Sequence, residues 1–223
     1  MRKEQRLPLE VLAPYLVPGP APLGPPSQEP APPLDWRTLF GNEHPVEIEV
    51  GFGKGLFLVT AGQANPDINY LGIEIVRKYQ LFTANRIARR GLNNVRLACA
   101  DARSFLPQRV AEQSVQAIHV YFPDPWWKKR HHKRRLFTLD FARQCLRVLR
   151  PGGMFLIATD VADYAEMVRA TVTECGGFVE LPPPPEKPAE HDMDYLTNFE
   201  RKFRLQGKTI YRMRYQRAVA EGK

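Results

Sequence analysis

One short stretch of the sequence combines an acid, aromatic rings and a dense run of basic side chains. Asp124 stands between two prolines and is followed by Trp126 and Trp127, in the run PDPWW. The prolines restrict the backbone around the acid, and a tryptophan ring offers a flat face on which a base can stack. Residues 128–135 contain six Lys and Arg residues that could receive phosphates. A charge run alone is usually a solvated surface, but its attachment to the Asp124 turn favours a site for a nucleic acid base.

A second candidate is a glycine-rich turn formed by Gly51, Gly53 and Gly55, between a predicted strand and a predicted helix. Glycine permits a tight turn and a close approach of a ligand to the backbone, and the following helix offers free N–H groups. The spacing is a weak signal, and a purely structural turn is the alternative. Leu56 stands where a dinucleotide fold would place its third glycine, which disfavours NAD.

Acidic residues stand at the ends of the next two predicted strands, Glu74 at the end of the first and Asp101 at the end of the second. A carboxylate after the first of these strands can accept both ribose hydroxyls, and one after the second can accept the amino group of adenine. Together they would outline an adenosine. The alternative is a pair of ordinary surface acids, which their shared position at strand ends disfavours.

These residues need a scaffold, and from Pro45 onward short apolar runs alternate with helical patterns. The predicted strands are Val46–Val50, Asn69–Ile75, Val95–Ala100, Val115–Phe122, Met154–Thr159 and a late Thr209–Tyr215. The predicted helices are Gly55–Ala64, Val76–Arg90, Leu136–Leu149 and Val161–Cys175. This alternation predicts an α/β fold, a parallel sheet with helices on both faces. In such sheets ligands bind at the carboxyl ends of the strands, where the candidate acids stand.

Residues 1–36 contain ten of the 21 prolines and are predicted to form a flexible or loosely docked arm, followed by one domain over residues 37–223. The formal net charge of +8 favours an anionic partner, with nucleic acid first. No apolar run approaches the ~20 residues needed to cross a bilayer, and prolines interrupt the N-terminus where a signal peptide would need apolar residues. We therefore expect a cytoplasmic protein with no membrane partner.

No metal site is expected. His131 and His132 are adjacent, but no third and fourth ligands stand at usable spacing. The three cysteines lie far apart among apolar neighbours and indicate neither a disulfide framework nor a zinc site.

From Glu49 to about Thr159 the pattern resembles the class I S-adenosylmethionine-dependent methyltransferases. The resemblance implies a Rossmann-like fold, with a mostly parallel seven-stranded sheet, an antiparallel C-terminal strand and helices on both faces. It also implies S-adenosylmethionine as cofactor, with the turn of Gly51, Gly53 and Gly55 holding its methionine portion, Glu74 its ribose and Asp101 its adenine.

The run PDPWWKKRH closely matches the signature of the bacterial tRNA (guanine-N7)-methyltransferases, with further matches at Thr159-Asp160 and Thr197–Glu200. The match extends from about Pro45 to Tyr215. It implies methylation of guanine N7 in tRNA, at position 46 of the variable loop. A monomer or homodimer with no obligate protein partner is expected.

Carried onto this sequence, the family's cofactor positions correspond to four acids: Glu49, Glu74, Asp101 and Asp124. Its tRNA-contacting positions correspond to Lys128, Asp160, Thr197, Asn198, Phe199 and Glu200. Asp124 is the expected catalytic residue. Trp127 falls where the signature varies and receives no specific role.

Two alternatives remain open. One is a methyltransferase for an exocyclic amino group, because Asp-Pro-Pro-Tyr turns serve that chemistry, although the turn here reads Asp124-Pro125-Trp126. The other is a non-catalytic RNA-binding module that retains the fold, which the complete set of four acids disfavours.

Overall fold

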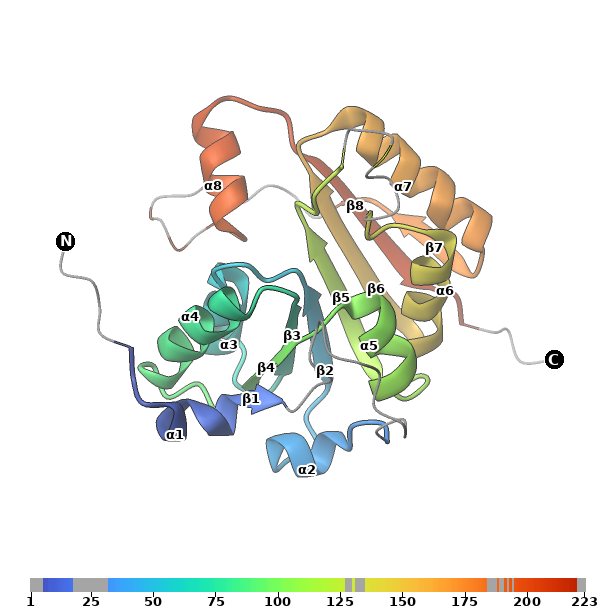
Figure 1. The fold of residues 1–223 in the computed structure, drawn as a ribbon. Coiled ribbons are helices and arrows are strands. Elements are labelled where there is room, and N and C mark those ends of the chain that lie inside the picture. Colours follow the sequence, from blue (N-terminus) through green and yellow to red (C-terminus); the bar gives the residue numbers. More distant parts are fainter. Residues whose placement is uncertain are drawn as a thin grey trace.

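The computed structural model describes residues 6–17, 32–126, 130, 135–183, 188, 191, 193 and 195–219. Within these residues one sheet of eight strands has the order β1-β4-β3-β2-β5-β6-β8-β7 (Figure 1). The strands are β1 (Leu16–Val17), β2 (Val46–Val50), β3 (Asn69–Glu74), β4 (Val95–Cys99), β5 (Val115–Tyr121), β6 (Leu149–Thr159), β7 (Phe178–Leu181) and β8 (Tyr211–Arg217).

Only β8 runs against its neighbours, since it pairs antiparallel with β6 and β7 while every other pairing is parallel. The predicted mostly parallel sheet with an antiparallel C-terminal strand is confirmed. The chain builds outward from β2 through β3 to β4, then returns to the other side of β2 with β5. This reversal of strand order opens a crevice at the carboxyl ends of β2 and β5.

Helices cover both faces of the sheet, as predicted (Figure 1). They are α1 (Leu9–Leu12), the 3-10 helix η1 (Ala13–Tyr15), α2 (Trp36–Phe40), α3 (Leu56–Ala64), α4 (Arg77–Ala88), α5 (Ala102–Arg109), α6 (Leu139–Val148), α7 (Ala162–Cys175) and α8 (Asn198–Leu205). One core lies under α5, α6 and α7 and includes Phe105, Phe141 and Val168. A second lies under α1, α3 and α4 and includes Leu12 and Phe57.

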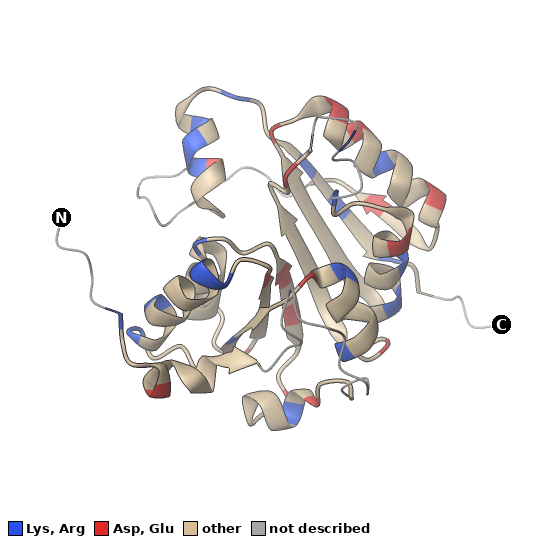
Figure 2. Cartoon of the chain, in the orientation of Figure 1, with Lys and Arg blue, Asp and Glu red and all other residues tan. Residues whose placement is uncertain are grey.

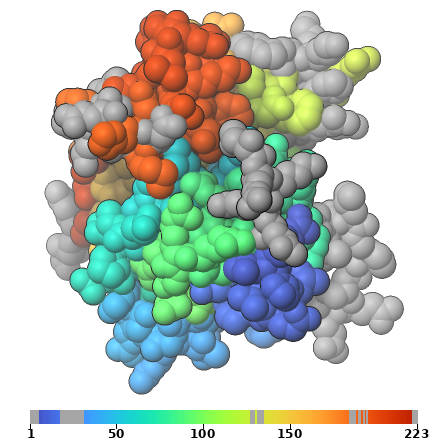
Figure 3. Space-filling view, turned by 90° about the vertical axis from the view of Figure 1, so that its left-hand side faces the viewer, coloured from blue at the N-terminus to red at the C-terminus, as the bar shows by residue number. Residues whose placement is uncertain are grey.

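The expected strand count of seven is wrong, because β1 adds an eighth strand at the edge of the sheet. Leu16 and Val17 pair in parallel with β4, and Leu12 is fully buried. Figure 3 shows α1 (dark blue) lying against α4 (green). Residues 6–17 therefore pack as part of the domain, which corrects the expected loosely docked arm over this part of residues 1–36. Their prolines fit because Pro8 caps α1 and Pro14 lies in the first turn of η1, where a missing N–H costs no bond.

Several element boundaries also differ from the prediction, most clearly the N-terminal ends of α6 and β6. Helix α6 begins at Leu139 instead of Leu136, because the Thr138 hydroxyl caps it by accepting from Phe141 N at 3.2 Å. Strand β6 begins at Leu149, so that the Pro-Gly-Gly segment at 151–153 lies inside the strand. Gly152 accommodates this irregular segment with φ 75°.

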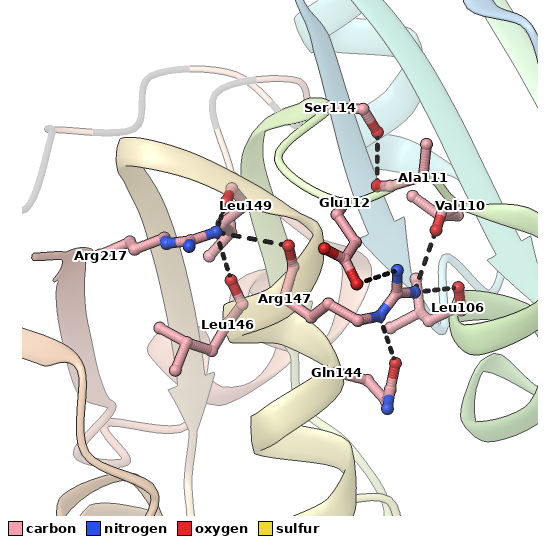
Figure 4. Close-up of polar contacts among 10 residues, drawn as sticks. All are labelled: Leu106, Val110, Ala111, Glu112, Ser114, Gln144, Leu146, Arg147, Leu149 and Arg217. Atoms are coloured by element: carbon pink, nitrogen blue, oxygen red, sulfur yellow. Dashed lines mark hydrogen bonds and ion pairs between the residues drawn. The ribbon is translucent and has the colours of Figure 1, made fainter. Parts of the chain in front are cut away.

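Two arginines fasten the helices on one face to the far end of the sheet (Figure 4). Arg217, at the end of β8, donates to the carbonyl oxygens of Leu146, Arg147 and Leu149 at the C-terminus of α6. Arg147 in turn donates to the carbonyl oxygens of Leu106 and Val110 at the C-terminus of α5, at 2.8 and 3.0 Å. A guanidinium satisfies several orphan carbonyls at once and carries the charge that a helix C-terminus favours.

Candidate active site

A cavity of about 960 Å³ lies in the crevice at the carboxyl ends of the strands. Among its lining residues are all four acids that the sequence singled out: Glu49 from β2, Glu74 from β3, Asp101 after β4 and Asp124 after β5. Helix α8 stands above the same edge of the sheet (Figures 1 and 3). The structure therefore brings together residues that are far apart in the sequence.

The three glycines of the turn have different surroundings. Gly51 and Gly53 line the cavity with φ 80° and 49°, and a Cβ on either would meet nothing within 4 Å. These two leave space in which a ligand could approach the backbone. Gly55 does not line the cavity, and a Cβ there would lie 2.2 Å from Cγ2 of Thr83 on α4. The close packing of α3 on α4 therefore requires glycine at this position, and the cofactor contact expected of Gly55 stays a prediction.

Glu74 holds the glycine turn in place. One carboxylate oxygen accepts from Gly53 N at 3.0 Å and the other from Val76 N at 3.0 Å, and the residue is 8% exposed. A carboxylate has about four lone-pair sites, so two remain for hydroxyl donors of a ligand. The geometry suits a ribose contact at a carboxylate that is already fixed.

Glu49 is the least satisfied polar group in the cavity wall. It is 2% exposed, and its Oε2 is buried with no hydrogen-bond partner among the described residues. Burial, and then the negative charge of Glu74, raise the pKa of Glu49 well above its usual value. An unpaired buried carboxyl is costly, and a cationic group in the cavity would satisfy it. The ammonium of the methionine portion of S-adenosylmethionine has the required charge and donors, so this wall fits the cofactor.

Asp101 is already engaged by Arg103. Its Oδ1 caps α5 by accepting from Arg103 N at 2.9 Å, and its Oδ2 lies 2.6 Å from Arg103 Nη2. Burial acts to raise the pKa of Asp101, but the hydrogen bonds and charge of Arg103 outweigh it and lower this pKa below its usual value. The carboxylate is therefore a charged acceptor, as recognition of an adenine amino group requires, and Arg103 also lines the cavity.

The backbone around Asp124 is strained on both sides. Phe122 and Trp126 have φ 52° and 45°, a left-handed region that residues with a side chain rarely adopt. Trp126 N donates to Asp124 Oδ1 at 3.0 Å, and Arg135 Nε donates to the carbonyl oxygen of Pro125 at 2.9 Å. These bonds hold the turn so that the exposed Asp124 carboxylate borders the cavity.

Helix α8 supplies the remaining wall. Thr197, Asn198 and Phe199, which are expected to contact tRNA, line the cavity, and Thr197 caps the helix by accepting from Glu200 N at 3.0 Å. The Phe199 ring is 53% exposed and lies 6.3 Å from Phe122, centroid to centroid. An exposed aromatic side chain at a cavity rim can stack on a base.

Of the predicted substrate positions that the structure describes, Asp160 and Glu200 do not line the cavity. Glu200 is buried and accepts from Arg212 Nη2 at 2.7 Å and from Leu196 N at 2.8 Å, so it anchors α8. Asp160 lies 3.4 Å from the ammonium of Lys208. Lys128, with His131 and His132, lies outside the described residues. Among the residues that are described, no group of three or more metal-ligating side chains occurs.

Several lining residues were not predicted, among them Arg103 and Tyr121. Lys202 also lines the cavity, because it follows Phe199 by three residues on α8 and so shares its face. Tyr121 was read only as the end of a strand. Nothing in the sequence distinguishes it from a core aromatic residue, and only the position of the cavity reveals its exposure to a ligand.

Comparison with known proteins identifies the family. Residues 43–213 match a family model described as "Putative methyltransferase". The tRNA (guanine-N(7)-)-methyltransferase of Rhodopirellula baltica is 42% identical over 82% of this chain and 70% of its own length. The enzyme of the same name from Geobacter metallireducens is 37% identical over 85% of this chain and 90% of its own length.

Solved structures agree on the fold. The 16S rRNA methyltransferase KamB superposes with a TM-score of 0.60 over 82% of this chain and 93% of its own, at 17% sequence identity. At that identity the likeness concerns the fold alone. No helix within the described residues is long and apolar enough to cross a membrane. The extent and identity of the sequence matches show that the chain belongs to the tRNA (guanine-N(7)-)-methyltransferase family.

Proposed function

We propose that this protein transfers the methyl group of S-adenosylmethionine to N7 of a guanine in tRNA, at position 46 of the variable loop. The observation that carries the proposal is one cavity bordered by the glycine turn, the adenosine-type acids and the Asp124 turn. A cofactor and a base could therefore meet in one space. The substrate is inferred from the family.

The cofactor roles follow from how each acid is engaged. Glu74 and Asp101 are charged acceptors at neighbouring strand ends and would hold the ribose and the adenine amino group. Glu49, with its unpaired buried oxygen, would receive the ammonium of the methionine portion. When bound, S-adenosylmethionine supplies an electrophilic methyl group on its sulfonium.

The protein's task in methyl transfer is alignment. Guanine N7 carries an in-plane lone pair and no proton, so no general base is required. Holding the nucleophile in line can lower the barrier by several kcal/mol, up to ~7 to 11 in the best intramolecular models. The rigid turn around Asp124 and the exposed ring of Phe199 stand on the same cavity and suit the positioning of a flat base.

Asp124 would also offset the charge that develops. As N7 acquires the methyl group the guanine becomes cationic, so its N1–H and amino group become stronger donors. A carboxylate that accepts these bonds is more stabilising in the transition state than in the ground state. The same bonds favour guanine over adenine, whose matching edge lacks the N1–H donor.

Phosphate contacts would supply most of the tRNA affinity. Figure 2 shows Lys and Arg (blue) on α8 and on α4, the helices on either side of the cavity. Basic residues at the α8 end of the chain include Lys202 and Lys208, and Lys202 lines the cavity. Residues 128–135, of which the structure describes Arg130 and Arg135, would add to this surface. We expect the protein to act in the cytoplasm, as a monomer or homodimer.

Transfer of a labelled methyl group to unmodified tRNA tests the proposal. After nuclease digestion, mass spectrometry should find 7-methylguanosine, at position 46 when the modified fragment is mapped. An N2-methylated guanosine would favour the exocyclic amine alternative. Tight binding of S-adenosylmethionine with no turnover on any tRNA would favour the non-catalytic alternative.

A further inference from the structure

A chain of polar side chains, partly buried at Glu47 and buried at His119 and Tyr121, leads along β2 and β5 to the cavity wall. Glu47 Oε2 lies 2.8 Å from His119 Nε2, and His119 Nδ1 lies 2.8 Å from the Tyr121 hydroxyl. Tyr121 is the only one of these three residues among those lining the cavity within the described part of the chain. The proposed reaction leaves all three without a role.

The register of β2 and β5 explains why these three side chains lie in a row. Residues two apart on a strand share a face, so Glu47 and Glu49 of β2 point the same way, as do His119 and Tyr121 of β5. The two strands are adjacent and parallel, with Glu49 opposite His119. The Phe57 ring of α3 covers the pair, with its centroid 4.5 Å from His119 and 5.3 Å from Tyr121. The Phe57 ring therefore shields His119 and Tyr121 from water.

The partners assign the direction of the hydrogen bonds. Burial acts to raise the pKa of Glu47, but the hydrogen bond and positive charge of His119, the hydrogen bond of Gln116 and the charge of Arg150 outweigh it, and this pKa lies below its usual value. An ionised Glu47 accepts only, so His119 carries a proton on Nε2. When the imidazole carries this proton alone, Nδ1 is an acceptor, and the Tyr121 hydroxyl must donate to it.

This direction leaves the Tyr121 oxygen with lone pairs toward the cavity. Glu49 lines the same cavity with an unpaired Oε2, and the raised pKa of Tyr121, caused by burial and then by the charge of Glu49, agrees with their closeness. The third nearby carboxylate, Glu200, is paired with Arg212 at 2.7 Å. The wall thus presents acceptors from Glu49 and Tyr121, which suits a group that only donates.

We infer that Glu47 and His119 hold Tyr121 as a second acceptor, beside Glu49, for the primary ammonium of the methionine portion of S-adenosylmethionine. The inference rests on the proposed function, because it requires the cofactor to bind in this cavity. An ammonium has three donors and no acceptor, so one carboxyl oxygen leaves it incompletely paired. Glu47 and His119 act as positioning residues, and Tyr121 contacts the ligand.

Two adenosine ligands separate this role from a structural one. S-adenosylhomocysteine retains the ammonium, whereas 5′-methylthioadenosine lacks the whole amino acid portion. In Tyr121→Phe we expect the Kd of S-adenosylhomocysteine to rise about tenfold, the loss of one hydrogen bond to a charged group. The Kd of 5′-methylthioadenosine should stay within about twofold. Calorimetry on the full chain measures both.

Tyr70→Phe is the matched control. Tyr70 lies in the same core and its ring meets Phe57 edge-on at 6.0 Å, but it does not line the cavity. It should bind both ligands as the parent does. Equal changes for both ligands in Tyr121→Phe, or no change for either, would overturn the inference while leaving the proposed function intact. Failure of the parent to bind S-adenosylhomocysteine would overturn both.

Glu47→Gln tests the positioning step at a residue outside the cavity wall. Gln116 Nε2 donates to Glu47 Oε1 at 3.2 Å, so the new amide should keep its oxygen toward Gln116 and turn its nitrogen toward His119. The imidazole proton would then move to Nδ1 and occupy the Tyr121 oxygen. We expect a loss of about threefold for S-adenosylhomocysteine alone. An unchanged Kd would show that Tyr121 needs no such support.

Discussion

Replacing Asp124 by Asn separates the charge of this residue from its shape. Asp124 Oδ1 accepts from Trp126 N, and an amide oxygen can keep that bond. The amide nitrogen then replaces Oδ2, so a donor faces the N1–H and amino group of the guanine, where two donors cannot pair. The turn itself should persist, because the residue is exposed and the substitution keeps its volume.

The expected loss is that of a preorganised electrostatic partner, about 10² to 10³ in turnover. The assay is single-turnover methylation with saturating tRNA and cofactor, which separates chemistry from binding. Asp140→Asn serves as the control, because this aspartate is 93% exposed in its side chain, lies on α6 and does not line the cavity. A rate for Asp124→Asn within about threefold of the parent would show that other residues suffice for alignment and charge.

Three further changes test the remaining parts of the argument. The pKa of Glu49 is raised in the folded protein, so the stability that this carboxyl contributes is present at low pH and is lost as the pH rises toward that pKa. In thermal scans without ligand, Glu49→Gln should therefore have a higher melting temperature than the parent near pH 8. Near pH 5 the two melting temperatures should be about equal. Equal melting temperatures for variant and parent at both pH values would contradict the assignment of Glu49 as an unpaired carboxyl. Arg217→Met should lower the free energy of unfolding by about 2 to 3 kcal/mol, measured by urea denaturation, because it leaves the α6 carbonyl oxygens unpaired. The control is Arg37→Met, which should change this free energy little because the Arg37 side chain is 77% exposed. Lys202→Ala should weaken tRNA binding and reduce the slope of log affinity against log salt by about 0.9, and an unchanged slope would remove it from the phosphate contacts.

The sheet was predictable where apolar periodicity is strong. Strand Val46–Val50 alternates apolar residues with glutamates, and Val95–Cys99 is mostly apolar, so both stand out from the flanking turns. Strand β1 escaped prediction because it has two residues and lies beside a proline-rich segment. The short β7 is mostly exposed, so it carries no clear pattern of burial.

The site was predictable as a set of acids at strand ends, because topology alone brings such ends together. The environments of these acids were not predictable. Asp101 forms an ion pair with Arg103, and their spacing of two residues in the sequence could have suggested this pairing. The unpaired oxygen of Glu49 follows from the lack of a donor among the described residues around it, which only the packed structure reveals.

Glu49 and Glu200 show how the environment of an acid, and not its position in the sequence, decides its function. Both were carried over as ligand-contacting acids, and both are almost fully buried. Glu200 is neutralised by Arg212 from β8 and binds Leu196 N, so its charge is already matched by the fold. Glu49 has no such partner among the described residues, so its buried carboxyl remains available to a ligand. Glu200 should therefore affect tRNA only by holding α8 and with it Phe199. Truncating Glu200 should weaken tRNA binding and stability together, whereas changing Glu49 should separate cofactor affinity from stability.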